Sequence, residues 1–420
     1  MIHPFAYLFE RFPSFVQTFC YREVREMVRQ GMNPLVVSLR QPEDAPNLAE
    51  PLKIPITYLP PEKQLRSEID LHLVARNLPS RVRKILKQRR SETDSQRMFE
   101  AAWLGPFLAE KGVRHVHAHF GGMAARTAWW LGELYGIGFS FTGHANDIFV
   151  EHDVPVGNAM LVKRAKLVIT ETDFARRWME EQHSPAKGKV VRIYNGITIP
   201  EAAPRPPANP PHILSVGRYV EKKGFSDLIE CCHLIRDRGL DFLCTIAGGG
   251  PLHEELLQQI QRLRLESYVR LLGPLPQAEV ASLLSTVNLF VLACVPEKDG
   301  GSDNLPTVVA EAMAAGVPTI STTVAGVPEM ITSEQDGLLV EPRSPAQLAA
   351  AVERLFDDPT LAARLGAAGR EKAQRKFAIE NTVRELKHLM VDRLRLPAPP
   401  PARVYDPEWQ PVERKWWRFW

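Results

Sequence analysis

The stretch Asp303-Asn304-Leu305-Pro306-Thr307-Val308-Val309-Ala310-Glu311-Ala312-Met313-Ala314-Ala315-Gly316 places one carboxylate before a helix start and another inside the helix. Proline suits the first turn of a helix, because its missing N–H would have no partner there, so Pro306 predicts a helix that begins near Leu305. The unpaired N–H groups at such a helix start attract an anion such as a diphosphate. Glu311, further along the helix, is placed to accept hydrogen bonds from a diol. The stretch therefore predicts a sugar-nucleotide site.

A second segment supplies cations for the same ligand. Ile213-Leu214-Ser215-Val216-Gly217 is typical of a buried strand that ends in glycine, and Arg218 and Lys223 follow it. Open α/β sheets bind ligands at the carboxyl ends of their strands. These two side chains are therefore expected to neutralise two phosphates without a metal. The alternative is that both are surface charges and that Glu311 is a solvated helix residue.

Apolar strands alternate with helical stretches along the chain, which predicts parallel sheets with helices on both faces. The Pro-rich segment 204–211 is incompatible with a regular helix or a central strand and indicates a linker, with a domain boundary near residue 205. The fold class is therefore α/β, with two doubly wound halves that face a cleft. Strands are expected at 35–38, 113–118, 139–141, 167–170, 212–216, 242–246, 269–272, 289–293, 318–321 and 337–340, and helices at 21–30, 123–135, 344–369 and 379–394.

The composition is that of a globular protein. The chain has 420 residues, 45% of them hydrophobic and 24% charged, and its net charge of +3 gives no case for nucleic-acid binding. Its five cysteines have no metal-ligand spacing and are expected to be reduced, buried thiols of a cytosolic protein. No apolar run reaches the length of a membrane span, and the start lacks a signal-peptide pattern. We therefore expect a protein of the cytoplasmic side.

Two segments carry charge patterns that suit a membrane surface. Basic and apolar residues alternate over 81–90, and the tail 397–420 joins a Pro-rich spacer to Arg414-Lys415-Trp416-Trp417-Arg418-Phe419-Trp420. Basic amphipathic segments and interfacial tryptophans bind anionic lipid. A solvated helix face, and tryptophans packed back onto the protein, are the alternatives. Peripheral attachment at the inner face of the cell membrane is thus one expectation.

Further motifs occur in order along the chain. Together with those above they resemble retaining glycosyltransferase family 4, the group 1 transferases, and those of the front half resemble its colanic-acid and exopolysaccharide branch. They are His117-Ala118-His119-Phe120-Gly121, Phe141-Thr142-Gly143-His144-Ala145-Asn146-Asp147-Ile148-Phe149, Tyr194-Asn195-Gly196-Ile197, Ala247-Gly248-Gly249-Gly250-Pro251-Leu252, Glu311-Ala312-Met313-Ala314-Ala315-Gly316-Val317-Pro318 and Asp336-Gly337-Leu338-Leu339-Val340.

The resemblance implies a GT-B fold, in which two Rossmann-like domains face a cleft and the last helix crosses back to the first domain. Residues 1–205 would then form the acceptor-binding domain and 206–377 the nucleotide-sugar-binding domain. Residues 378–396 would be the returning helix, followed by the tail.

The resemblance also assigns donor-binding roles. It implies that Glu311 binds the ribose and that Asp303 contacts the donor sugar, although Asp303 is shorter than the usual Glu and Asn304 stands where the family commonly has Gly. This departure bears on the identity of the donor. The residues expected at the diphosphate are Arg218, Lys223, Gly249, Asn304 and Leu305.

The front half is expected to hold the reacting sugar and the acceptor. By resemblance, His144 approaches the reactive carbon of the donor sugar, and Asp147 orients His144 or receives the acceptor's proton. Thr18, His119 and Gly121 are expected to border the acceptor and the cleft, although Val16-Gln17-Thr18 replaces the Ser-Glu-Thr of this branch. His115, His117 and His119 share one face of a strand, but the family has a similar strand without a metal, so no metal ligand is assigned.

The function expected is metal-independent, retaining transfer of a hexose from a nucleotide-diphosphate sugar to a lipid-linked or oligosaccharide acceptor in exopolysaccharide or cell-envelope assembly. No cofactor is expected besides this donor substrate. Because no separate nucleophile is evident, front-face transfer without a covalent intermediate is preferred by analogy. The alternatives are an inactive sugar-nucleotide-binding scaffold and a sugar-nucleotide epimerase of the same fold.

Overall fold

The first half of the chain forms a parallel seven-stranded sheet. The computed structural model describes residues 3–14, 17–42, 52, 54–89, 94–150, 153–200, 208–298 and 300–396. The strand order is β3-β2-β1-β4-β5-β6-β7, and every neighbouring pair is parallel. The strands are β1 (Ala6–Arg11), β2 (Leu35–Arg40), β3 (Ile56–Tyr58), β4 (His115–His119), β5 (Gly138–Gly143), β6 (Leu167–Thr170) and β7 (Val190–Arg192).

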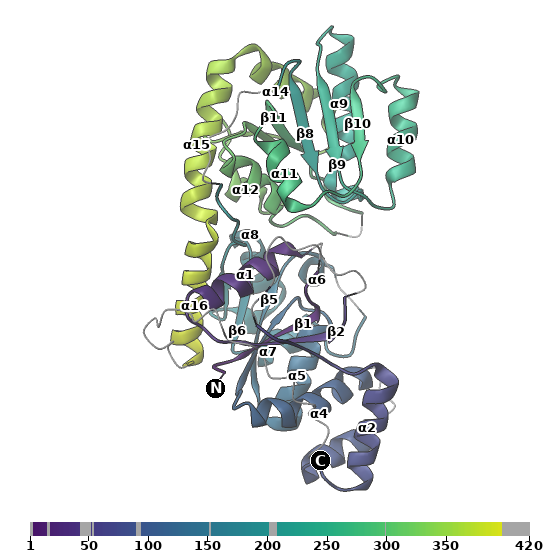
Figure 1. Cartoon of the computed structure of the whole chain (residues 1–420), viewed down its shortest axis with the longest axis vertical. Helices are drawn as coiled ribbons and strands as arrows, with labels where there is room; N and C mark the ends of the chain where they lie inside the picture. The colour runs from purple at the N-terminus through teal and green to yellow at the C-terminus, as the bar shows by residue number, and fades with distance from the viewer. Residues whose placement is uncertain are drawn as a thin grey trace.

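The helices of the first half connect these parallel strands, and α2 and α4 lie at the end farthest from the second half (Figure 1). They are α1 (Thr18–Arg29), α2 (Glu62–Val74), α3 (Ser80–Gln88), α4 (Ser95–Glu110), α5 (Met123–Tyr135), α6 (Asn146–Phe149), α7 (Asn158–Arg164) and α8 (Asp173–Gln182), with a 3₁₀ turn at Ser184–Ala186.

The second half repeats the plan with a parallel six-stranded sheet in the order β10-β9-β8-β11-β12-β13. Its strands are β8 (His212–Val216), β9 (Leu243–Ala247), β10 (Val269–Leu272), β11 (Leu289–Leu292), β12 (Thr319–Thr322) and β13 (Leu338–Val340). Its helices are α9 (Phe225–Asp237), α10 (His253–Arg262), α11 (Gln277–Leu284), α12 (Thr307–Ala314), α13 (Val327–Met330), α14 (Pro345–Asp357) and α15 (Pro359–Phe377), with a 3₁₀ turn at Glu221–Lys223.

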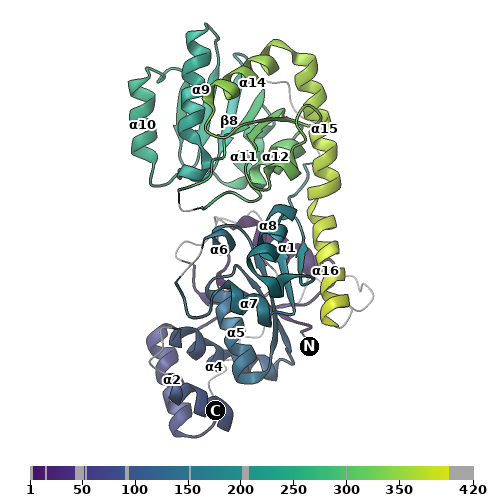
Figure 2. The same ribbon diagram turned by 180° about the vertical axis from the view of Figure 1, so that it is seen from behind.

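The final helix, α16 (Ile379–Leu394), returns to the first half, as predicted. In both views α15 runs alongside the second half and α16 alongside the first (Figure 1 and Figure 2). Val383, Leu386 and Met390 of α16 join one hydrophobic cluster with Tyr21 and Met27 of α1. This burial of apolar surface ties the end of the chain to its beginning.

Each predicted strand is present, with its ends shifted by at most two residues. The predicted strands do not include β1, β3 and β7, of which β3 and β7 have three residues each. The predicted helix 344–369 is wrong in two respects. It is two helices, because Pro359 begins α15 and the carboxylate of Asp358 accepts a hydrogen bond from the N–H of Leu361 at 2.9 Å, and α15 continues to Phe377.

The helix predicted to start near Leu305 is present, but its start lies two residues later. Helix α12 begins at Thr307, and Pro306 precedes it in an extended conformation with φ −67° and ψ 98°. The proline therefore lies just outside the helix and ends the loop that carries Asp303 and Asn304. This loop, rather than a helical turn, presents the main-chain N–H groups before α12.

The remaining predictions about organisation have mixed outcomes. The described part of the linker does not fix the domain boundary near 205, because residues 201–207 lie outside the described residues, as does the tail 397–420. All five cysteines are free and buried, as predicted. No helix among the described residues combines the length and the apolar character needed to cross a bilayer. In α3, Val82 and Leu86 are buried, so its apolar face packs within the protein.

Candidate active site at the junction of the two halves

Side chains from the two halves meet directly at one junction. Asn304 accepts a hydrogen bond from the Thr172 hydroxyl at 2.5 Å and donates one to the main-chain oxygen of His144 at 2.8 Å. The Lys222 ammonium donates to the side-chain oxygen of Asn146 at 3.0 Å. The loops after β5, β6 and β8 and the loop before α12 contribute these residues. Carboxyl ends of strands from both sheets thus converge, as the sequence predicts.

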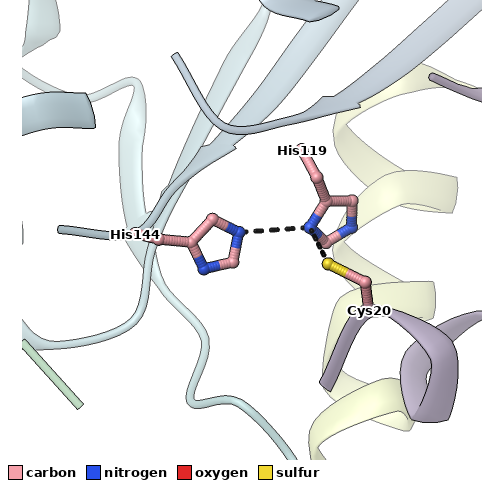
Figure 3. Close-up of side chains that lie close together, drawn as sticks. All are labelled: Cys20, His119 and His144. Carbon is pink, nitrogen blue, oxygen red and sulfur yellow. Dashed lines mark hydrogen bonds between the residues drawn. The ribbon is translucent and has the colours of Figure 1, made fainter. Parts of the chain in front are cut away.

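His144 lies at the centre of a buried chain of hydrogen bonds. Its Nδ1 is 2.6 Å from a carboxylate oxygen of Glu171, and its Nε2 is 3.2 Å from Nδ1 of His119. His119 in turn lies 3.1 Å from the Glu23 carboxylate, which accepts from the Tyr7 hydroxyl at 2.7 Å. Figure 3 shows the His144 and His119 rings with their nitrogens facing each other.

The carboxylates around His144 set its protonation. Burial lowers the pKa of His144, but the adjacent Glu171 carboxylate, assisted by Asp147 and Glu23, outweighs burial and raises the pKa above its usual value. Burial raises the pKa of Glu171 despite its imidazole partner. Phe120 packs against the His144 ring with a centroid separation of 4.3 Å. The ring is therefore fixed in place and biased toward the imidazolium form.

Asp147 shapes the loop that follows β5. Its carboxylate accepts hydrogen bonds from the main-chain N–H groups of Gly121 at 2.8 Å, Ala145 at 2.8 Å and His144 at 3.1 Å. The carboxylate that contacts the His144 ring belongs to Glu171 instead. Glu171, rather than Asp147, therefore orients the His144 ring, and Asp147 fixes the backbone of the loop. Its second predicted role, receiving the acceptor's proton, stays a prediction.

In the second half, the predicted cations and acids lie close together. Lys223 Nζ is 2.6 Å from the Asp303 carboxylate, and both side chains are 13% exposed. Burial lowers the pKa of Lys223, but the Asp303 charge outweighs burial and raises it. Arg218 is exposed, and its side chain has no hydrogen bond or ion pair with any residue in the described ranges. An anion that enters here finds one free guanidinium and one ammonium.

The glycine-rich turn packs tightly against the loop that carries Arg218. The carbonyl oxygen of Gly249 accepts a hydrogen bond from the Tyr219 N–H at 2.8 Å. Gly248 has φ +151°, and a Cβ there would lie 1.8 Å from the Gly217 carbonyl oxygen. Only glycine fits such a close approach. The turn is therefore positioned by the backbone beside Arg218, where the sequence predicts the diphosphate.

The loop before α12 offers unused donors. Within the described part of the chain, the main-chain N–H groups of Asn304 and Leu305 donate no hydrogen bond. The Asn304 side chain is buried and spans the junction, as given above. The loop thus has two features: the main-chain N–H groups of Asn304 and Leu305, which can donate to an anion, and the Asn304 side-chain amide, which joins the halves.

Glu311 forms an ion pair across the junction. Its carboxylate lies 2.7 Å from Nη1 of Arg22, a residue of α1 that is 4% exposed. The sequence prediction assigns Glu311 to a ribose, so its carboxylate is in the expected region but has a partner from the other half. Arg22 was not among the predicted site residues.

The predicted acceptor-side residues lie around His144. His119 contacts it directly, and the main chain of Gly121 is fixed by Asp147. Thr18 is the first residue of α1 and is partly exposed, and its neighbour Phe19 packs on the His144 ring at a centroid separation of 4.8 Å. The structure thus brings these residues together beside the histidine, whereas their contact with an acceptor stays a prediction.

The three histidines of β4 do not converge on one point. His115 and His117 both bond the Ser140 hydroxyl at 2.8 Å, and His117 also bonds Thr142 at 3.0 Å. Burial lowers the pKa of His115 to about 3 and that of His117 well below its usual value, so both are neutral core residues.

Two other groups among the described residues have ligand atoms close enough to hold a metal: Cys20 with His119 and His144, and Glu23 with His117 and His119. Cys20 Sγ lies 3.5 Å from Nδ1 of His119 (Figure 3). A cysteine binds metal as a thiolate, but burial and the nearby Glu23 charge raise the pKa of Cys20 well above its usual value. We therefore assign the first group to hydrogen bonding within the protein.

Sequence reasoning missed the carboxylates that hold the two histidines. Glu171 follows β6, which pairs with β5, and His144 follows β5. Adjacent parallel strands bring their carboxyl ends together, so a map of strand neighbours would have indicated this pair. Glu23 and Arg22 lie in a helix far from either partner in sequence, and a single sequence contains no signal for those contacts.

The protein has two halves, each a parallel sheet covered by helices, and cations and acids lie where the halves meet. This architecture defines a GT-B protein. Solved structures share the fold: sucrose-phosphate synthase of Thermosynechococcus elongatus has a TM-score of 0.70 at 18% identity, covering 93% of this chain and 99% of that one. HepE of Anabaena in complex with UDP and glucose has a TM-score of 0.68 at 17% identity, covering 92% and 99%.

Sequence comparison then identifies the family. Residues 200–372 match the family described as Glycosyl transferases group 1. The provisionally named colanic acid biosynthesis glycosyltransferase WcaL of Escherichia coli K12 is 32% identical over 298 residues, which cover 68% of this chain and 71% of that protein. The chain belongs to the group 1 glycosyltransferases, family 4, and is a retaining glycosyltransferase. This confirms the family, the fold class and the enzyme class that the sequence predicts.

Proposed function

We propose that this enzyme transfers a hexose from a nucleotide-diphosphate sugar to a lipid-linked or oligosaccharide acceptor in exopolysaccharide or envelope polysaccharide assembly. The observation that carries the proposal is the junction itself, where the loop before α12 contacts the His144 loop and Asp303 of the same loop pairs with Lys223. The name of WcaL and the UDP and glucose bound to HepE support the class of product and of donor.

In this proposal the donor replaces contacts that the protein makes with itself. Arg218 and Lys223 hold the diphosphate, together with the Gly249 turn and the N–H groups of Asn304 and Leu305. Lys223 is now bonded to Asp303, so a bound diphosphate shares the ammonium and leaves Asp303 free to contact a sugar hydroxyl. Glu311 accepts hydrogen bonds from the ribose. The positive side chains stabilise the negative charge of the departing diphosphate, so the proposed transfer needs no metal.

The proposed chemistry is front-face transfer. The acceptor oxygen bonds to the anomeric carbon on the face from which the diphosphate departs, and the carbon–oxygen bond to the diphosphate breaks. The proton of the acceptor hydroxyl passes to the departing phosphate oxygen, so no separate nucleophile forms an intermediate. In this proposal Glu171 holds Nδ1 of His144, and Nε2 exchanges its contact with His119 for a hydroxyl of the reacting sugar, which it positions. Asp147 maintains the loop through its main-chain contacts.

A ligand panel tests the donor site. Binding to the folded state raises the unfolding temperature, so we expect one nucleoside diphosphate and its sugars to protect the wild type in the presence of EDTA. Arg218→Ala and Glu311→Ala should abolish that protection. Protection by no nucleotide would overturn the proposal, and protection that requires a divalent ion would overturn its metal-independent form. Release of the nucleoside diphosphate from the protecting sugar then measures turnover.

We further propose that the enzyme works at the cytoplasmic face of the membrane, where a lipid-linked acceptor would be presented. The support is the basic face of α3, on which Arg81, Lys84 and Lys87 are exposed while its apolar face is buried. Attraction to anionic lipid through such cations weakens with salt. We expect vesicles of anionic lipid to float the wild type at low salt. Unchanged flotation after neutralising these cations and deleting 397–420 would remove this location.

A further inference from the structure

Arg22 has an unused hydrogen-bonding edge inside the junction. The residue is 4% exposed, and its Nη1 contacts the Glu311 carboxylate at 2.7 Å. Its Nε and Nη2 are buried and have no hydrogen-bond partner among the described residues. Burying guanidinium donors without partners is costly. The arrangement therefore indicates that a ligand satisfies them.

The free edge has the geometry of an oxyanion binder. Nε and Nη2 lie on the same side of a guanidinium, where two N–H bonds are parallel and can donate to two oxygens of one phosphate. Nη1 lies away from that edge, so the bond to Glu311 leaves the fork intact. A lysine, with one compact ammonium, does not offer this arrangement.

The position of Arg22 beside Glu311 indicates which phosphate its free edge would bind. Glu311 lies four residues into α12 from its first residue, Thr307, which is about 6 Å along the helix axis. The free N–H groups of Asn304 and Leu305 lie just beyond that helix start. Arg22, which contacts Glu311, is therefore within reach of a phosphate that lies between the Glu311 carboxylate and this loop.

We propose that Arg22 is a further donor-binding residue, whose Nε and Nη2 bind a phosphate of the nucleoside diphosphate while Nη1 orients Glu311 against the ribose. This inference rests on the proposed function. Because Arg22 belongs to the first half and the other diphosphate-binding residues belong to the second, the ligand bridges the halves. Both free nitrogens are shielded in the present arrangement, so the ligand enters when the halves separate and holds them when they close.

The test compares diphosphates with nucleosides. Calorimetric affinities are measured for uridine, guanosine, adenosine and thymidine 5′-diphosphates and for the matching nucleosides. Arg22→Gln should weaken binding of the preferred diphosphate about 10- to 100-fold. It should weaken nucleoside binding much less, because the nucleoside loses only the orientation of Glu311. Arg22→Lys, which keeps the charge beside Glu311, should also lose affinity for the diphosphate. Arg29→Gln, on the exposed face of the same helix, is the matched control and should bind like the wild type.

The outcomes separate this inference from the proposed function. If no nucleotide binds the wild type, both fail. Suppose that the wild type binds a diphosphate, that Arg218→Ala does not bind it, and that Arg22→Gln binds it with full affinity. In that case only the inference about Arg22 fails. An equal loss for nucleoside and diphosphate in Arg22→Gln would also overturn the phosphate contact, because Arg22 would then act through Glu311 alone. Urea unfolding of each variant verifies that it is folded, and Arg22→Lys replaces Arg22→Gln if the latter is not.

Discussion

At the scale of single residues, the pairing of His144 with Glu171 predicts a measurable pH dependence. The pKa of His144 is raised in the folded protein, so protonation of His144 stabilises the fold below its unfolded pKa of about 6.5. This contribution is lost as the pH rises through the raised folded value. Burial also raises the pKa of Glu171, which acts in the same direction at lower pH. The buried, neutral His115 and His117 act in the opposite direction, so the contribution of His144 is measured as the difference in free energy of unfolding between the wild type and a variant that lacks the Glu171 charge.

Glu171→Gln should remove much of this pH dependence. The substitution keeps a hydrogen-bond acceptor for His144 but removes the charge, and should cost about 1–3 kcal/mol at pH 6 and less at pH 8. Urea unfolding at the two pH values measures both numbers. Glu181→Gln, at an exposed position in the same half, should change neither. A difference in free energy of unfolding between the wild type and Glu171→Gln that is the same at both pH values would contradict the assignment of the proton to His144.

Individual site residues differ in how far the sequence predicts them. Arg218, Lys223, Asp303 and Glu311 follow from strand ends and helix starts, which local patterns reveal, and the structure brings them to one junction. The partners Glu171 and Arg22 are set by which strands and halves are neighbours. That information lies in the topology, and no spacing along the chain encodes it.

At the scale of elements, helix α8 has a cap supplied by the other half. The Glu329 carboxylate of α13 accepts hydrogen bonds from the N–H groups of Asp173 at 2.9 Å and Phe174 at 2.7 Å. The side chain of Thr172 caps the same helix by accepting from the N–H of Ala175 at 3.0 Å. A carboxylate at a helix N-terminus also interacts favourably with the helix dipole.

Glu329→Ala should therefore loosen the start of α8. We expect a loss of about 1–2 kcal/mol of stability and faster amide hydrogen exchange at Asp173 and Phe174, because both lose their acceptor. Exchange at Ala175 should change less, since Thr172 remains. Glu334→Ala removes an exposed ion pair with Arg354 and serves as the control. Unchanged exchange at both amides would show that the interdomain cap contributes nothing.

Element boundaries illustrate the limits of local patterns. Pro306 predicts a helix start, yet α12 begins one residue after it because the preceding loop is held by Asn304 across the junction. Tertiary contacts there decide where the helix begins, as they commonly do at helix ends. Apolar strands such as β11 (LFVL) and β13 (LLV) were predicted, whereas the three-residue strands β3 (ITY) and β7 (VVR) each include a polar residue and were not.

At the scale of the whole molecule, the two halves are linked by α16. Leu386 is 1% exposed in the cluster that α16 forms with α1, so Leu386→Ala removes buried methyl groups and leaves a cavity. Such changes cost about 2–5 kcal/mol, and here the cost should fall on the first half. Arg22 and Glu23 are on α1, so loss of this packing should also weaken nucleotide binding, although Leu386 touches no part of the proposed donor site.

The measurement combines urea unfolding with amide hydrogen exchange in the whole protein, followed in each half. In Leu386→Ala, amides of β1 and α1 should exchange faster while those of β8 and β11 keep wild-type rates. Glu385→Ala, an exposed neighbour on α16, should match the wild type in both measurements. If Leu386→Ala accelerates exchange in both sheets equally, the halves unfold as one cooperative unit. If Leu386→Ala changes the exchange rates of neither sheet, α16 contributes no stability to the first half. The prediction that its packing on α1 supports nucleotide binding is then wrong.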